Sequence, residues 1–523
     1  MKTSKVLTAS VCGLDVELVS VETDLSQGLP GLTLVGLPNP TVRESKERIR
    51  SAITNSGLRF PQQRITVNLF PADTRKEGSH FDLPLAVSVI AAAEQFDDSA
   101  LASSAFIGEL SLDGTLHRTE PATALLLGIR EQGIKKVFLP EENLEDASEI
   151  DDMECYPANR LEEVVDHLSG KFRIDPVATR LETGGAGRSA LRSDFGDYSE
   201  VKGQERAKRA LQICAAGGHG LAMYGPPGTG KSMLASRIPT ILPALDKNEI
   251  REVAKLYSIA GESSRSNRPA DERPFRAPHH SVTAAAMVGG GRQPKPGELT
   301  LAHRGVLFLD ELPEFDRRTL DMLRQPLEDE YIDLSRVGYR SRYPCRFILI
   351  VAMNPCPCGY YGDPGHVCNC DETRRRRYLS KVSGPFLDRI DMHVQVSGVE
   401  YSELRGGESA SSEELSEGVL LAREMQRRRS GAEGDESSGA GDVCNARLTP
   451  EQTERICRLS GKSETLFRKA YGVYGFSARQ GRKMLRLART IADIEGSEII
   501  ETEHVSEAVS YRRPAEMSGG CDG

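Results

Sequence analysis

The residues best suited to chemistry form a glycine-rich run, Gly225-Pro226-Pro227-Gly228-Thr229-Gly230-Lys231-Ser232. An apolar stretch at residues 220–224 precedes this run and a helix-forming stretch at 233–237 follows it. This is the strand, loop and helix order of a G-x-x-x-x-G-K-[ST] phosphate-binding loop. The backbone N–H groups of such a loop face phosphate oxygens, its lysine reaches the β- and γ-phosphates, and its serine holds Mg²⁺. We therefore predict that Lys231 and Ser232 bind a nucleoside triphosphate together with Mg²⁺.

Two further apolar stretches end in polar residues of the kind that hydrolysis needs. Residues 305–309 lead to Asp310 and Glu311, the pattern of a Walker B motif, and residues 347–353 lead to Asn354. We expect Asp310 to act through the ligand shell of Mg²⁺ and Glu311 to polarise the water that attacks the γ-phosphate. Asn354 is similar to a sensor-1 asparagine, which positions that water. The alternative for Asp310 and Glu311 is a buried strand with a solvated acidic end.

Two arginines are candidates for stabilising the charge that develops on the γ-phosphate. The segment around Arg389 resembles the part of magnesium-chelatase ATPase subunits that supplies an arginine finger, which requires a ring because the finger reaches a neighbouring subunit. The alternative is a surface ion pair of Arg389 with Asp388 or Asp391. Arg479, at the start of a predicted helix, resembles the sensor-2 arginine that closes on the nucleotide of its own subunit. The arginines that compete with it for this role are Arg482, Arg486 and Arg489.

Four cysteines follow Asn354 closely, at Cys356, Cys358, Cys368 and Cys370. Four thiolates at the spacing C-x-C-x9-C-x-C suit a closed, tetrahedral structural Zn²⁺ site, in which His366 could replace one cysteine. An iron–sulfur cluster and reduced, unligated thiols are the alternatives. Because this knuckle begins two residues after Asn354, it could couple a bound substrate to hydrolysis. The basic run at residues 374–377 either contacts phosphates or begins a solvated helix.

The length and composition limit the class of protein. A chain of 523 residues is expected to form two to four domains. Its net charge of −9 argues against an overall basic surface, although a local basic groove or pore is compatible with it. The sequence has no run of about 20 apolar residues and no apolar core near its first residues, which predicts no membrane span and a cytoplasmic location. Eleven cysteines without a secretion signal do not suggest a disulfide scaffold.

The first 170 residues form a predicted domain of their own. Alternating strands at 15–21 and 32–35 and a helix at 40–56 indicate a mixed α/β domain. The stretches 65–86, 106–114 and 133–140 resemble elements of the Lon-protease proteolytic domain.

A Lon-type peptidase needs a serine nucleophile that a lysine activates. Here the two corresponding positions fall near His80 and Thr123, and Ser79 lies one place away from the first of them. We therefore predict a non-proteolytic domain that serves binding or oligomerisation.

The remaining segments complete the chain. We predict a flexible linker at 171–194, a P-loop core at 195–400, a helix with a partly disordered connection at 401–445, a helical lid at 446–513 and a disordered tail at 514–523. Within the core, residues 279–298 are interpreted as a loop that projects toward the pore of a ring. Residues 332–343, which carry Arg336, Arg340 and Arg342, are predicted to form a hairpin with one basic face, which either lines a pore for nucleic acid or is a solvated edge.

Taken together, these segments resemble the magnesium-chelatase-like AAA+ proteins called YifB or ComM over nearly the whole chain. Residues 273–281, 296–315, 354–363 and 384–391 match that family's pattern closely. The resemblance implies an α/β multidomain fold with a Lon-protease-like N-terminal domain, an AAA+ P-loop core with an inserted cysteine knuckle, and a C-terminal helical lid. It also implies a hexameric motor driven by ATP, a helicase that promotes branch migration of DNA during natural transformation, with Mg²⁺ and structural Zn²⁺ as cofactors.

Two other function classes are alternatives to a DNA motor. A remodelling chaperone of the magnesium-chelatase type would insert Mg²⁺ into a porphyrin with partner subunits and would not respond to DNA. An ATP-dependent peptidase would lose its activity on substitution of Ser79, and the missing serine–lysine dyad counts against it.

Overall fold

The computed structural model describes residues 2–94, 101, 103–148, 150–179, 195–262, 271–291, 294–336, 339–363, 365–399, 409–431 and 444–512. The chain divides into two compact units. The first contains Met1–Thr183, Ile250–Ala270 and Asp333–Tyr343, and the second contains the remainder. Most of the predicted linker, residues 401–408 and 432–443 of the predicted connection at 401–445, and the predicted tail lie outside the described residues.

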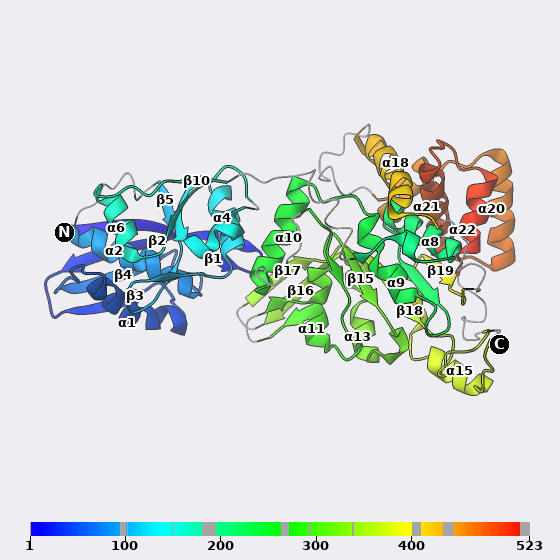
Figure 1. Cartoon of the computed structure of the whole chain (residues 1–523), viewed down its shortest axis with the longest axis horizontal. Helices are drawn as coiled ribbons and strands as arrows, with labels where there is room; N and C mark the ends of the chain where they lie inside the picture. Colours follow the sequence, from blue (N-terminus) through cyan, green and yellow to red (C-terminus); the bar gives the residue numbers. More distant parts are fainter. Residues whose placement is uncertain are drawn as a thin grey trace. The chain divides into compact units, whose positions relative to one another are not determined.

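The first unit is built on an eight-stranded mixed sheet in the order β10-β9-β8-β5-β1-β2-β4-β3. Its longest members form the antiparallel hairpin drawn in dark blue in Figure 1. The strands are β1 (Lys2–Cys12), β2 (Asp15–Ser26), β3 (Gly31–Val35), β4 (Arg64–Phe70), β5 (Ser104–Phe106), β8 (Lys136–Pro140), β9 (Glu154–Ala158) and β10 (Val177–Ala178), beside the small hairpin β6 (Glu109–Leu110) and β7 (Leu116–His117).

Helices cover both faces of this sheet because its strands place apolar side chains on both. Successive residues of a strand point to opposite faces, and so Val137 and Phe138 belong to two different apolar clusters. One cluster joins the sheet to α1 (Pro40–Asn55), α2 (Asp82–Glu94) and α6 (Leu161–Leu168). The other joins it to α4 (Ala122–Glu131) and α5 (Leu144–Ala147). The mixed α/β architecture predicted for this domain is confirmed.

The second unit contains a parallel sheet in the order β12-β15-β18-β11-β19. The strands are β11 (Leu221–Tyr224), β12 (Phe275–Arg276), β15 (Val306–Leu309), β18 (Ile348–Met353) and β19 (Met392–Gln395). Every residue of β11, β15 and β18 is buried. Continuous apolar strands of this kind are typical of parallel sheets that helices cover on both faces.

Short elements surround the sheet of the second unit. They are α8 (Glu205–Gly217), α9 (Lys231–Ser236), α11 (Ala284–Val288), α12 (Glu298–Leu301), α13 (Arg317–Met322), α14 (Pro326–Asp329), α15 (Glu372–Leu379), α16 (Gly384–Leu387) and the ladder of β13 (Gly289–Gly290) with β14 (Lys295–Pro296). The described part of the stretch interpreted as a loop at 279–298 therefore holds the short helix α11 and a two-residue ladder, and it ends where α12 begins. The helix α10 (Lys247–Ala260) precedes this stretch, and the predicted hairpin is confirmed as β16 (Tyr331–Arg336) and β17 (Tyr339–Pro344). Most residues of α10 and of this hairpin belong to the first unit.

The helices of the C-terminal segment confirm the helices predicted there. They are α18 (Ser412–Gly431), α19 (Pro450–Ile456), α20 (Gly461–Tyr474), α21 (Ala478–Ile494) and α22 (Thr502–Ser510). Side chains of α8, α18 and α21 share one apolar cluster with the parallel sheet. The Ser477 hydroxyl accepts a hydrogen bond from the N–H of Gln480, which fixes the start of α21. In the part of the chain that is described, no helix is long and apolar enough to cross a bilayer.

Candidate nucleotide site and cysteine cluster

The phosphate-binding loop follows the carboxyl end of β11 and leads into α9. Gly225 approaches the end of β19 so closely that an added Cβ would lie 2.0 Å from the carbonyl oxygen of Val396. Gly228 and Gly230 have φ angles of 77° and 85°, in the left-handed region that favours glycine. Two separate requirements therefore explain the glycines of this motif. Gly225 allows a close backbone approach, and Gly228 and Gly230 allow a tight turn.

Lys231 lies at the centre of this loop. Its ammonium group donates to the carbonyl oxygens of Gly225 and Pro226, at 2.7 Å each, and to Oδ1 of Asn354 at 3.3 Å. Burial lowers the pKa of Lys231 from its usual value, while the nearby charge of Asp310 opposes that shift. The structure therefore brings the predicted phosphate-binding lysine and the predicted sensor asparagine into direct contact.

The Walker B carboxylates lie beside the loop. The Ser232 hydroxyl donates to Oδ2 of Asp310 at 2.5 Å, so the two residues predicted to hold Mg²⁺ are in contact. A hydroxyl and a carboxylate oxygen are ligands that Mg²⁺ accepts. The backbone N–H of Glu311 donates to Oδ1 of Asp310 at 2.8 Å. Glu311 itself has a φ angle of 52°, which is an uncommon backbone conformation for residues other than glycine, asparagine or aspartate.

His280 also contacts the predicted catalytic base, and the sequence did not identify this role. Its Nδ1 lies 3.4 Å from Oε2 of Glu311, and its ring packs edge-on against Phe315. The topology explains the contact, because Phe275 in β12 pairs in parallel with Val306 in β15. Residues that follow β12 therefore leave the sheet at the same edge as residues that follow β15. His280 is placed to hold Glu311 in a defined position.

All of these side chains meet at the carboxyl edge of the parallel sheet. The phosphate loop follows β11, Asp310 and Glu311 follow β15, and Asn354 follows β18, and these three strands are neighbours in the sheet. Crevices at the carboxyl ends of parallel strands are the usual place for ligands in α/β folds. The arrangement suits hydrolysis of a nucleoside triphosphate.

The two candidate arginines lie at the opposite edge. They line a pocket of about 660 Å³ whose other walls include Gly220, Phe347 and Asp391, which lie at the amino ends of β11, β18 and β19. Strands of four to six residues separate the two edges by about 13–20 Å. Arg389 and Arg479 are therefore brought together with each other but not with the phosphate loop of their own chain.

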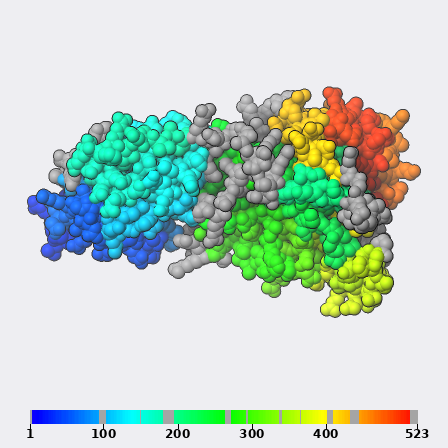
Figure 2. Space-filling view, in the orientation of Figure 1, coloured from blue at the N-terminus to red at the C-terminus, as the bar shows by residue number. Residues whose placement is uncertain are grey.

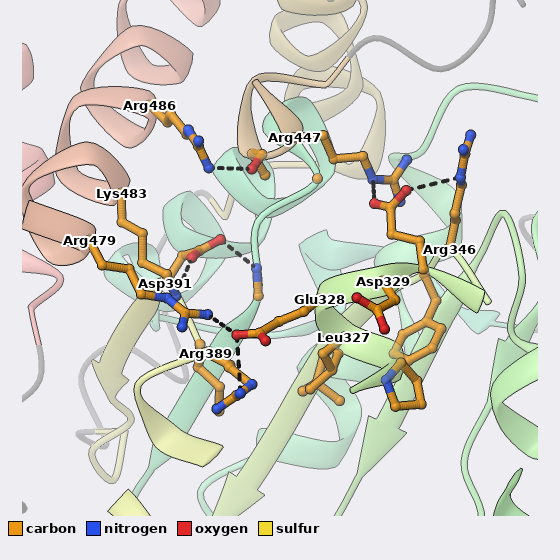
Figure 3. A pocket seen from close by; sticks show the side chains of 18 of the residues that line it. Leu327, Glu328, Asp329, Arg346, Arg389, Asp391, Arg447, Arg479, Lys483 and Arg486 are labelled. Carbon is orange, nitrogen blue, oxygen red and sulfur yellow. Dashed lines mark hydrogen bonds and ion pairs between the residues drawn. The ribbon is translucent and has the colours of Figure 1, made fainter. Parts of the chain in front are cut away.

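Glu328 joins the two arginines in this pocket (Figure 3). Its Oε1 lies 2.6 Å from Nη2 of Arg479 and 3.1 Å from Nη2 of Arg389. The hydrogen bond from Arg479 and the charge of Arg389 hold the pKa of Glu328 below its usual range. Arg389 therefore forms its ion pair with Glu328. The alternative considered from the sequence was an ion pair with Asp388 or Asp391.

The neighbouring ion pair of this pocket also uses residues from both the sheet and α21. Lys483 lies 2.9 Å from Oδ1 of Asp391, and His219 lies 3.2 Å from Oδ2. Although burial opposes ionisation, Lys483 and His219 hold the pKa of Asp391 well below its usual range. The first turn of α21, which carries Arg479, is therefore fixed against the amino edge of the sheet.

The four cysteines of the knuckle converge on one point. Their sulfur atoms all lie within 4.8 Å of one another. The separations are 3.3 Å for Cys356 and Cys358, 3.7 Å for Cys356 and Cys368, and 3.6 Å for Cys358 and Cys368. Four sulfurs at about 2.3 Å from one tetrahedral Zn²⁺ would be about 3.8 Å apart, so the donor set fits that ion.

The surroundings of the knuckle act differently on its thiols. A backbone N–H of Tyr360 donates to the sulfur of Cys358 and lowers the pKa of that thiol to about 6, whereas burial raises the pKa of Cys356 to about 12. His366, considered as a substitute ligand, lies 2.8 Å from Asp363 instead and stacks on Tyr360. Cys370 completes the set of four.

The counterparts of a Lon-type dyad are not arranged for catalysis. In the described residues the Ser79 hydroxyl donates to Oε2 of Glu109 at 2.5 Å and contacts no lysine. Thr123, at the expected lysine position, is buried and donates to the carbonyl oxygen of Asp146. His80 is buried as well, and its Nε2 lies 2.9 Å from the carbonyl oxygen of Ala9. The non-proteolytic interpretation of the domain stays a prediction.

His80 gives a pH-dependent stability that can be measured. Burial lowers its pKa from 6.5 to about 4, so the folded state excludes a proton that the unfolded state binds. The stabilisation is complete above pH 6.5 and is lost as the pH falls toward 4. We expect the free energy of unfolding of the wild type to drop by about 2 kcal/mol more than that of His80→Gln between pH 7 and pH 5. Urea unfolding at both pH values tests this, and equal losses in the two proteins would contradict it.

Three family models match the chain. The family described as magnesium chelatase, subunit ChlI, matches residues 197–404. The families described as subunit ChlI of Mg-chelatase and magnesium chelatase, subunit ChlI C-terminal, match residues 21–143 and 409–512.

Individual relatives extend this similarity over the whole chain. The chain is 42% identical over 516 residues to the uncharacterized protein YifB of Escherichia coli K12, covering 98% of this chain and 97% of the relative. It is 40% identical over 514 residues to the competence protein ComM of Haemophilus influenzae, covering 98% of both chains. A magnesium-chelatase 67 kDa subunit of Heliobacterium mobile is 30% identical over 227 residues, which cover 38% of this chain and 30% of the relative.

Proposed function

This chain belongs to the YifB/ComM family of magnesium-chelatase-like AAA+ proteins, and on that premise we propose that it is an ATP-driven ring motor that acts on DNA. Its activity would be that of a helicase that promotes branch migration of recombination intermediates during natural transformation. The relative from Haemophilus influenzae is named a competence protein, which supports the last part of the proposal. The proposal includes a cytoplasmic location.

The ATPase part rests on the carboxyl edge of the parallel sheet. There Lys231 would bind the phosphates of the substrate ATP, with Ser232 and Asp310 holding Mg²⁺. When bound, Mg²⁺ would neutralise charge on the phosphate oxygens. Glu311, held by His280, would take up proton density from the attacking water, and Asn354 would orient that water. The observation that carries this part is that all these groups leave neighbouring strands at one edge.

The position of the two arginines supports the ring part of the proposal. Since Arg389 and Arg479 lie at the edge of the sheet opposite the phosphate loop of their own chain, we propose that both act on the ATP of a neighbouring subunit. This placement does not match the expectation that Arg479 closes on the nucleotide of its own chain. A closed ring, which we propose to be a hexamer, gives every ATP one such pair of arginines.

The DNA part rests on family membership and on local charge. A remodelling ATPase of the chelatase type without DNA activity is the second candidate, and the match to the chelatase subunit from Heliobacterium mobile favours it over 38% of the chain. Two local features support the DNA part, namely the four-cysteine knuckle, which we propose holds structural Zn²⁺, and the exposed arginines that follow it. A peptidase is the weakest candidate because Ser79 contacts Glu109 and no lysine in the described residues.

ATP hydrolysis with and without a four-way DNA junction tests the proposal. For the wild type we expect the junction to raise the rate several-fold. A linear duplex of the same composition, tested in parallel, should raise it less. The blank is Glu311→Gln, which removes hydrolysis by this protein and reveals any contaminating ATPase.

The outcomes separate the candidate functions. Strong stimulation by the junction, followed by strand displacement on the same substrate, would support the motor. An ATPase that is indifferent to every DNA structure would exclude branch migration for this chain and would favour the remodelling ATPase.

A further inference from the structure

A projection from the second unit combines basic and aromatic side chains. It consists of the cysteine knuckle, residues 355–363 and 365–370, and of α15, and it is the yellow-green knob of Figure 2. Asp371 begins the helix by accepting a hydrogen bond from the N–H of Arg374. With a metal ion bound, the four cysteines would fix the fold of this small element.

Two arginines of the projection are unpaired within the described residues. Arg374 and Arg377 are exposed, lie three positions apart on α15 and form no ion pair there. The acidic residues around them are engaged elsewhere. Asp371 caps the helix and Glu372 lies 2.6 Å from Arg376. Side chains three positions apart lie on one helix face with Cβ atoms about 5–6 Å from each other. The two guanidinium groups can therefore contact neighbouring phosphates of one strand.

Stacked planar groups lie in the same projection. The guanidinium carbon of Arg375 lies 3.8 Å from the ring centroid of Tyr361, and His366 stacks on Tyr360 with 4.5 Å between ring centroids. Tyr361 is 38% exposed and the neighbouring Val367 is 85% exposed. Stacked aromatic and guanidinium planes beside free cations are the combination by which proteins bind single-stranded nucleic acid.

These features discriminate between kinds of nucleic acid. In a duplex the base faces are stacked on each other, so exposed aromatic rings gain little from it, whereas unpaired bases can stack on Tyr361 and His366. Resting on the proposed DNA function, we infer that the projection is the surface that binds single-stranded DNA. Its phosphates bind to Arg374 and Arg377, and its bases stack on the pairs Tyr361–Arg375 and Tyr360–His366.

The base of the projection touches the nucleotide site. Lys381, just after α15, lies 3.2 Å from Glu314, whose N–H donates to the carbonyl oxygen of Glu311 at 2.8 Å. On the other side, an added Cβ on Gly359 would lie 2.6 Å from the ring of Pro227 in the phosphate loop. A strand that moves the projection therefore acts on both halves of the ATPase site.

The experiment measures binding of a fluorescein-labelled oligothymidine of about 30 nucleotides to the full chain by anisotropy. For Arg374→Gln/Arg377→Gln we expect affinity to fall about tenfold and the slope of log affinity against log salt to fall in magnitude by about 1.4. The matched control is Arg427→Gln/Arg428→Gln, which removes two exposed arginines of α18 and should bind like the wild type. All three proteins are compared in zinc content and in Tm.

Photo-crosslinking of the wild type to an iododeoxyuridine oligomer provides a measurement that needs no variant. We expect the crosslinked peptide to contain Tyr360 and Tyr361. The inference is wrong, and the DNA motor stands, if the wild type binds the oligomer while the variant matches it in affinity and salt slope. Crosslinks confined to other segments, or binding to duplex alone, overturn the inference in the same way. A wild type that binds neither the oligomer nor the junction overturns the inference and the proposed DNA function together.

Discussion

Glu311→Gln is expected to lower the rate of ATP hydrolysis about 100- to 1000-fold while leaving ATP binding intact. The amide keeps the size of the side chain but cannot take up proton density from water. The phosphate contacts come from Lys231 and from the loop backbone, which this substitution does not touch. Steady-state hydrolysis and the binding of a fluorescent ATP analogue measure the two properties separately.

Glu464→Gln is the matched control for that substitution. Glu464 is an exposed carboxylate on α20 that pairs with Arg468, and its loss should change neither property. If Glu311→Gln kept more than about a tenth of the wild-type rate, a different group would have to be the base. If it lost nucleotide binding instead, Glu311 would contribute to the shape of the site through its unusual backbone conformation.

The residues whose arrangement could be predicted from the sequence belong to local patterns. Gly225 to Ser232 lie on one strand, one loop and one helix, so their spacing alone predicts their geometry. The same holds for the four cysteines, which lie within fifteen residues and meet without help from the rest of the chain. The parallel strands that end at Asp310 and Asn354 were also evident, because each is a continuous apolar run followed by a polar residue.

What the sequence missed depends on contacts between distant segments. Glu328 meets Arg389 and Arg479 across 61 and 151 positions, and nothing in the local sequence distinguishes it from other surface glutamates. Only the fold shows that Arg479 lies at the amino edge of the sheet.

The strand β1 was not predicted from the hydrophobic pattern, for a different reason. Its inward-facing residues include Ser4 and Thr8, which are polar. The Ser4 hydroxyl donates to the carbonyl oxygen of Ser88, whereas the buried hydroxyl of Thr8 has no hydrogen-bond partner among the described residues. A buried polar group with a partner costs little, and therefore it does not appear as a break in the core. An alternation rule that counts only apolar residues cannot find such a strand.

A mixture of two inactive variants is expected to hydrolyse ATP if Arg389 acts on a neighbouring subunit. Arg389→Ala should lose activity about 1000-fold because its neighbours' ATP lacks the guanidinium, and Lys231→Ala should lose it because its own loop cannot bind phosphates. In a mixed ring, an Arg389→Ala subunit has an intact loop and can receive Arg389 from a Lys231→Ala neighbour. Equal mixing makes about a quarter of the sites complete, so the mixture should recover up to about a quarter of the wild-type rate.

The double variant Lys231→Ala/Arg389→Ala is the control, since mixing it with Arg389→Ala supplies no arginine and should restore nothing. Recovery in the first mixture alone can come only from a site shared between subunits. If neither mixture recovered while both variants assembled normally, Arg389 would act within its own chain. In that case the segment from α16 to β19 would have to move Arg389 to the opposite edge of the sheet, away from its position beside Glu328.

The variant Arg389→Lys separates the effect of charge from that of geometry, because it keeps the cation but not the planar fork that pairs with phosphate oxygens.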